Sequence, residues 1–215
     1  MKLILTVFLL TVSQFILAQN TESFHFQNGD FLFQDIDCGP LCDAIEKVTP
    51  AYKDKHFSHV GLVVVKNDSV WVVEAIGEKV HLTTVNDFLK RQTNIIGKPK
   101  VVVGRLRNEF EKLNEKAVLF ALNQDGVHYD DAFLPNNGKY YCSELIFDAY
   151  KFANNGAAFF HLQPMTFKDP NTKKSFPAWK DYYRKINKKI PEGVKGCNPG
   201  LLANDNHLQI VYSFY

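Results

Sequence analysis

The sequence predicts an α+β fold in one domain, in which an antiparallel sheet packs against separate helices. The chain has 215 residues, of which 46% are hydrophobic and 22% are charged, so it can bury a core but is too short for several domains. Residues 57–66 and 69–76 are rich in valine and aromatic residues and flank an Asn-Asp pair, a hairpin turn signal. Two later segments, 109–123 and 142–152, repeat apolar residues at helical spacing.

The charge balance excludes one large class of partner. The chain has 25 Lys+Arg and 23 Asp+Glu, a formal net charge of +2. Nucleic-acid binding needs clustered charge that neutralises phosphates. We therefore expect no nucleic-acid partner, and function must reside in individual residues.

Residues 1–18 are typical of a secretory signal peptide. Lys2 precedes an apolar stretch, which Ser13 and Gln14 interrupt and which ends at Ala18. A transmembrane helix needs about 20 predominantly apolar residues, so we expect no stable transmembrane anchor. We expect cleavage near Ala18 and an exported, periplasmic or secreted bacterial protein whose single domain is residues 19–215.

The first half of the mature chain predicts mainly strands. GDFLFQD, from Gly29, reads as a short strand, and PLCDAIEKV reads as a helix because proline is tolerated in a first helical turn. The hairpin follows. After it we expect a strand at 79–82, a helix at 85–91 and a strand at 100–106.

The second half predicts mainly helices. Residues 109–123 form an amphipathic helix whose apolar face is core. A loop over 125–139 precedes the helix 142–152, whose buried stripe is expected to contain Leu145, Ile146, Ala149, Phe152 and Ala153. The tail predicts one more helix around Trp179 and a terminal strand at 208–214.

Four cysteines, Cys38, Cys42, Cys142 and Cys197, leave several states open. Disulfides persist in an exported protein, so Cys38 and Cys42 can bond to each other, one of them can bond to Cys197, or the thiols can stay free. A structural zinc site is disfavoured because no second close Cys/His pair accompanies the first. A bond to Cys142 would abolish the chemistry considered next.

The hairpin brings a histidine and a carboxylate together. With two loop residues, Lys66 faces Ser69 and opposed residue numbers sum to 135, so His59 lies diagonal to Glu74 on one face, within side-chain reach. A four-residue loop keeps this pairing, whereas a three-residue loop would put Glu74 on the opposite face.

Cys142 is placed where a thiolate is stabilised. The first turn of a helix has free N–H groups and a macrodipole that favour an anion. If His59 packs against that turn, the imidazole can pair with the thiolate and later protonate a leaving group, while Glu74 fixes its tautomer. The alternative is structural: a buried cysteine, histidine or strand glutamate is by itself most often part of the core or the surface.

Several segments in order resemble one family, the circularly permuted papain-like cysteine hydrolases of the YaeF/YiiX group, which belong to the NlpC-type superfamily. The segments are NGDFLFQ, AIEKVTPAY, FSHVGLVV, VVEA, YDDAF and YYCSELIFDAY, of which SHVG and CSEL are the most specific. The resemblance runs from about Asn28 to Tyr150 and does not cover the tail after Asn155.

This resemblance implies a circularly permuted papain-like fold, with the sheet packed against the helix that carries the nucleophile. It implies Cys142 as nucleophile, His59 as general base and acid, and Glu74 as the third polar residue. The backbone N–H of Cys142 is a natural oxyanion donor. Tyr129 and Asp130 are candidates for the substrate pocket, although a turn beside a packed tyrosine explains them equally well.

Three functions follow as hypotheses, none of which calls for a cofactor or metal. The first is a cysteine amidase or peptidase that acts on cell-envelope peptide through a thioester. The second is a lipid-directed acyl hydrolase or acyltransferase, because the group is similar to lecithin retinol acyltransferase and its phospholipase relatives. The third is a non-catalytic envelope binding module. An apolar groove beside Cys142 would favour acyl chains, and a polar cleft would favour peptides.

Overall fold

A computed structural model describes residues 24–67 and 69–215. The predicted signal peptide lies outside the described residues. Within them, no helix has the length and apolar character needed to cross a membrane.

The centre of the structure is a six-stranded sheet in which every neighbouring pair is antiparallel, as the sequence predicted. The strand order is β4-β3-β2-β1-β5-β8. The strands are β1 (Phe31–Gln34), β2 (His59–Lys66), β3 (Ser69–Ile76), β4 (Lys79–Thr84), β5 (Val101–Leu106) and β8 (Leu208–Ser213).

Helices surround this sheet, and a small second sheet lies in the tail. The helices are α1 (Pro40–Val48), α2 (Val85–Lys90), α3 (Asn114–Leu122), α4 (Cys142–Ala153), α5 (Pro177–Lys185) and α6 (Pro199–Ala203). Strands β6 (Gln163–Pro164) and β7 (Lys195–Gly196) pair with each other. The helix expected over 109–123 is divided: a 3-10 helix, η1 (Asn108–Leu113), leads into α3, as is frequent at helix N-termini.

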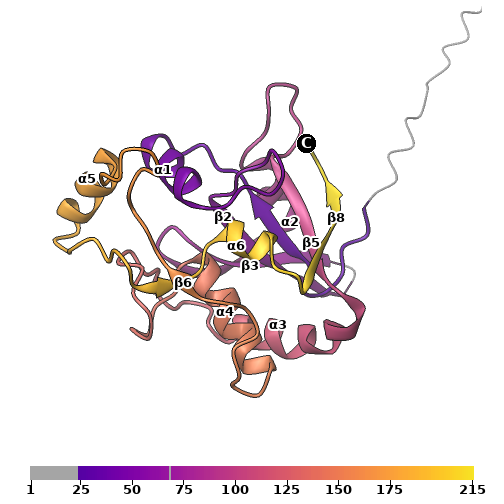
Figure 1. Ribbon diagram of the computed structural model, residues 1–215. Coiled ribbons are helices and arrows are strands. Elements are labelled where there is room, and N and C mark those ends of the chain that lie inside the picture. The colour runs from indigo at the N-terminus through magenta and orange to yellow at the C-terminus, as the bar shows by residue number, and fades with distance from the viewer. Residues whose placement is uncertain (1–23, 68) are drawn as a thin grey trace, which may run out of the picture.

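Alternate strand residues face two different cores. Phe31, Phe33 and Leu62 belong to a large cluster with α3 and α4, which lie together along one side of the sheet (Figure 1). Leu32 and Val63 belong to a smaller cluster around Phe88 of α2. The sheet is therefore buried on both faces.

Helix α4 is held by this large core. Leu145, Ile146, Ala149 and Ala153 are buried as predicted. Phe152, which was expected in the same stripe, is 54% exposed. It lies beside the stripe, where the centroid of its ring is 5.3 Å from that of Phe120 in α3.

A third cluster joins α1 to α5, which lie side by side at one end of the molecule (Figure 1). It is built on Ala44, Phe167, Trp179 and Tyr183. A disulfide between Cys38 and Cys42 closes the start of α1, whereas Cys142 and Cys197 are free and buried. Of the states that the sequence left open, the local disulfide is the one formed.

Candidate active site

The hairpin has the predicted register. Lys66 pairs with Ser69 and Leu62 with Val73, so opposed residue numbers sum to 135. His59, the first residue of β2, is therefore diagonal to Glu74 of β3. Its ring nitrogen Nε2 lies 2.6 Å from Glu74 Oε2, and both side chains are buried.

Gly61 contributes to this arrangement, because it lies opposite Glu74 and two residues after His59 on the same face of the sheet. A Cβ atom there would lie 2.4 Å from Val72 Cγ1 and 3.2 Å from the Phe88 ring. The glycine in the SHVG segment thus lets neighbouring side chains close over β2.

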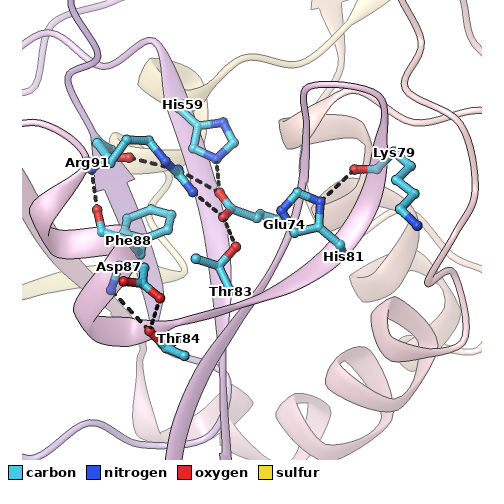
Figure 2. Close-up of polar contacts among 10 residues, drawn as sticks. His59, Glu74, Lys79, His81, Thr83, Thr84, Asp87, Phe88 and Arg91 are labelled. Carbon is cyan, nitrogen blue, oxygen red and sulfur yellow. Dashed lines mark hydrogen bonds and ion pairs between the residues drawn. The ribbon is translucent and has the colours of Figure 1, made fainter.

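Glu74 is the centre of a buried polar network. Arg91 donates to both carboxylate oxygens, at 2.9 Å from Nη1 and 2.5 Å from Nη2, and the Thr83 hydroxyl donates to Oε1 at 2.5 Å. Figure 2 shows His59, Arg91 and Thr83 converging on this carboxylate. Glu74 is fully buried, and the free-energy cost of burying its charge is offset by charged and polar partners on both carboxylate oxygens.

Sequence reasoning missed Arg91 and Gln34. Arg91 follows the last residue of α2 and also donates to Gln34 Oε1 at 3.1 Å, while the Gln34 amide donates to the Phe88 carbonyl at 2.8 Å. A glutamine that ends the apolar run FLFQ was the available signal, because a fully buried amide needs partners. Nothing local distinguishes Arg91 from an ordinary cation at a helix C-terminus.

The network shifts both pKa values in the direction of an ion pair. Burial opposes the charged form of Glu74, but hydrogen bonds from His59 and Arg91 outweigh it and lower the pKa of Glu74 to about 2. Burial likewise opposes charge on His59, but hydrogen bonding and charge attraction to the Cys142 and Glu74 side chains raise the pKa of His59 to about 9.

Cys142 is the first residue of α4, and only 7% of it is exposed. No side chain caps this helix N-terminus, so its free N–H groups are available to an anion. Because Glu74 occupies Nε2 of His59, Nδ1 is the ring nitrogen left for the thiol.

A cavity of about 350 Å³ opens beside Cys142. Tyr129 lines it, and its apolar wall includes Ile45, Val48, Phe133, Met165, Phe167 and Trp179. Much of this wall comes from the tail that the family resemblance left uncovered. Burial, followed by the charge of Cys142, holds the pKa of Tyr129 well above its ordinary value, so the hydroxyl remains a donor.

Asp130 does not line this cavity. Its carboxylate accepts backbone N–H groups from Ala132 at 3.0 Å and Leu134 at 2.6 Å. This is the turn geometry typical of aspartate, so the structure gives Asp130 a role in shaping the loop that carries Tyr129.

Cys197 lies in the same cavity wall as Cys142. Burial raises the pKa of its thiol to about 12, so it stays protonated at neutral pH. The Ser143 hydroxyl donates to the Cys197 carbonyl at 3.1 Å, which ties the tail to the first turn of α4.

Comparisons with known proteins identify the family of this chain. Residues 25–212 match the family model of the permuted papain-like amidase enzymes, YaeF/YiiX, C92 family. The uncharacterized protein YiiX of Escherichia coli K12 is 29% identical over 126 residues, which are 58% of this chain and 57% of that protein. The match thus spans a little over half the length of this relative.

A solved structure shows the same fold. It is the crystal structure of the metalloprotein yiiX from Escherichia coli O157:H7, with a TM-score of 0.67 and 24% identity over 87% of this chain and 97% of that one. The family match covers most of the chain, and the solved structure shares the arrangement of sheet and helices. This chain therefore belongs to the permuted papain-like amidase family.

Proposed function

We propose that this protein is an exported cysteine hydrolase that cleaves an amide or ester bond with Cys142, His59 and Glu74. The observation that carries the proposal is the convergence of the three: Glu74 holds Nε2 of His59, and the Cys142 side chain raises the pKa of the same imidazole. A thiol, a base and an orienting carboxylate are the parts that nucleophilic catalysis by cysteine needs.

The reaction follows from these positions. His59 accepts the thiol proton, and the Cys142 sulfur forms a bond to the substrate carbonyl carbon, whose oxygen becomes an anion. When this oxyanion collapses, the bond to the leaving nitrogen or oxygen breaks and His59 donates its proton to that atom. Water, deprotonated by His59, then attacks the thioester and releases the acid together with the Cys142 thiol.

Two donors can stabilise the oxyanion. The Cys142 backbone N–H points from an uncapped helix N-terminus. We assign the second to the Tyr129 hydroxyl, which lines the same cavity and whose raised pKa keeps it protonated. Arg91 acts at one remove, because it keeps Glu74 ionised and so keeps His59 oriented.

The cavity favours substrates with an apolar acyl group. Phe133, Met165, Phe167 and Trp179 form a wall without charged side chains, which suits an acyl chain better than a polar peptide. A lipid-directed acyl hydrolase or acyltransferase is therefore the second candidate function, beside cleavage of a cell-envelope peptide with an apolar side chain next to the scissile bond.

Two features support export to the periplasm or the medium. Residues 1–18 have the pattern of a signal peptide, and the disulfide between Cys38 and Cys42 is a bond that persists in oxidising compartments.

Our mechanism uses no metal, although the related Escherichia coli structure is described as a metalloprotein. In residues 24–67 and 69–215, no three His, Cys, Asp or Glu side chains converge to hold an ion. The proposed steps therefore rest on Cys142, His59 and Glu74.

The test is the rate of Cys142 alkylation by iodoacetamide against pH, measured in a Cys197→Ser background so that only one free thiol can react. We expect labelling to persist well below the ordinary thiol pKa of about 8.5 and to slow in His59→Ala and Glu74→Ala. If all three proteins label like an ordinary thiol, the hydrolase mechanism fails and the non-catalytic binding module replaces it. The two candidate substrate classes are then distinguished by comparing the rates of hydrolysis of acyl esters and peptide amides.

A further inference from the structure

The loop between α2 and β5 carries two isoleucine side chains into solvent. Ile95 is fully exposed and Ile96 is 70% exposed, whereas no other large apolar side chain in the described part of the chain is more than 55% exposed. In Figure 1 this loop is a narrow projection beside the C-terminus.

The loop tip is a folded structure. The Asn94 N–H donates to the Lys98 carbonyl at 2.8 Å, and the Gly97 N–H donates to the Asn94 carbonyl at 2.9 Å. The Asn94 side-chain oxygen also accepts the N–H groups of Ile96 and Lys98, at 3.1 and 3.0 Å. Gly97 has a φ of +78°, which favours glycine. The tip therefore holds the two isoleucines outward in one conformation.

The root of the loop belongs to the catalytic end of the sheet. Gln34 pairs with His59 on one side and with Val101, the first residue of β5, on the other. At its other end the loop begins at Arg91, which binds Glu74. Whatever the tip binds is thus brought to the end of the sheet where His59 begins β2.

The charge of the tip is positive. Residues 93–99 contain no acidic residue and one lysine, Lys98, for which no carboxylate within the described ranges lies in ion-pair distance. Lys100, by contrast, is neutralised by Asp35 and Asp37, each at 2.8 Å. The Lys98 ammonium is therefore available to an external anion.

A stable protein interface needs about 800 Å² of surface from each partner, which two side chains cannot supply. A few apolar side chains beside a cation instead suit the boundary between lipid headgroups and acyl chains. We propose that residues 93–99 dock this protein on a phospholipid bilayer that contains anionic lipid, with Ile95 and Ile96 inserted below the headgroups and Lys98 against a phosphate. This inference stands on the loop alone and does not depend on the proposed hydrolysis.

The test is co-sedimentation of the mature protein with vesicles of phosphatidylethanolamine and phosphatidylglycerol. We expect weak, reversible binding that falls at least about tenfold in the double variant Ile95→Ser, Ile96→Ser and about fivefold in Lys98→Gln. The matched control is Leu119→Ser, which removes a 55% exposed aliphatic side chain from α3 and should bind as the wild type. Circular dichroism checks that each variant is folded.

Three outcomes would overturn the proposal. The first is a folded wild-type protein that does not bind these vesicles, or that binds neutral phosphatidylcholine vesicles equally well. The second is a double serine variant that binds as well as the wild type, or a Leu119→Ser variant that loses as much. The third is self-association of the wild type, removed by the double variant in sedimentation velocity without any vesicle binding, which would identify a second copy as the occupant.

Discussion

Replacing Arg91 with alanine tests whether a charge network, rather than packing, organises the site. The pKa of Glu74 lies at about 2 instead of its ordinary 4.5, and this difference corresponds to about 3 kcal/mol of stability at neutral pH. His59 and Arg91 share that contribution. Because Arg91 is about a quarter exposed, water partly replaces it. We therefore expect Arg91→Ala to lower the free energy of unfolding by about 1 to 2 kcal/mol at pH 7.

The pH dependence distinguishes charge from packing. A carboxyl whose pKa is lowered by folding contributes stability above its unfolded pKa and loses it as the pH falls through its folded pKa. Lowering the pH therefore reduces the unfolding free energy of the wild type more than that of the variant, because the pKa of Glu74 is lowered less in the variant. We expect the difference in unfolding free energy, measured by urea denaturation, to be smaller by about 1 kcal/mol at pH 3 than at pH 7.

Arg105→Ala is the matched control, because Arg105 binds the buried Asp30 at 2.7 Å and lies over the Phe24 ring. It should also destabilise the fold but leave the pH profile of Cys142 alkylation unchanged, whereas Arg91→Ala should shift that profile. An Arg91→Ala protein with an equal stability loss at both pH values, or with the wild-type alkylation profile, would refute the network argument.

Three further predictions concern the same site. The pKa of His59 is raised from 6.5 to about 9, so the stability that its charged form contributes is complete below pH 6.5 and fades as the pH rises through 9. Urea titrations over this range should show a loss of about 2 to 3 kcal/mol in the unfolding free energy, and this loss should be absent in His59→Gln. Trp179→Ala should cost about 3 to 5 kcal/mol and, in kcat/KM across an acyl-chain series, shift preference toward bulkier groups. Gly61→Ala should cost about 1 to 3 kcal/mol by overpacking, and adding Val72→Ala, which removes the clashing methyl group, should restore the melting temperature.

The hairpin was predictable because its information is local. Two residues connect Lys66 to Ser69, and side chains alternate along strands, so the turn length alone fixes which residues share a face. The same holds for the helix that starts at Cys142, whose apolar spacing and start are contained in twelve residues. The contact between His59 and Glu74 and the start of α4 were therefore predictable, because residues close in the sequence determine both.

The rest of the network was not predictable because it depends on distant packing. Thr83 and Arg91 reach Glu74 only after β4 pairs with β3 and α2 turns back across the sheet. Gln34 joins through β1, which lies between β2 and β5 although the chain visits β5 much later. Such contacts across elements leave no periodic signal in the sequence.

Different parts of the chain form the cavity wall and the polar network around Glu74. Cys142 follows five of the six strands of the sheet in the sequence, so the chain between α4 and β8 is free to return over the start of that helix. It does so at Cys197, where the Ser143 and Tyr141 side chains bond the tail at 3.1 and 3.3 Å. The walls then come from α1, from the loop with Tyr129 and Phe133, and from residues 163–201. The polar network, by contrast, comes from β1 to Arg91. Substitutions in the tail should therefore change which acyl group is accepted without changing the pKa values of His59 and Glu74, to which the tail contributes no hydrogen bond.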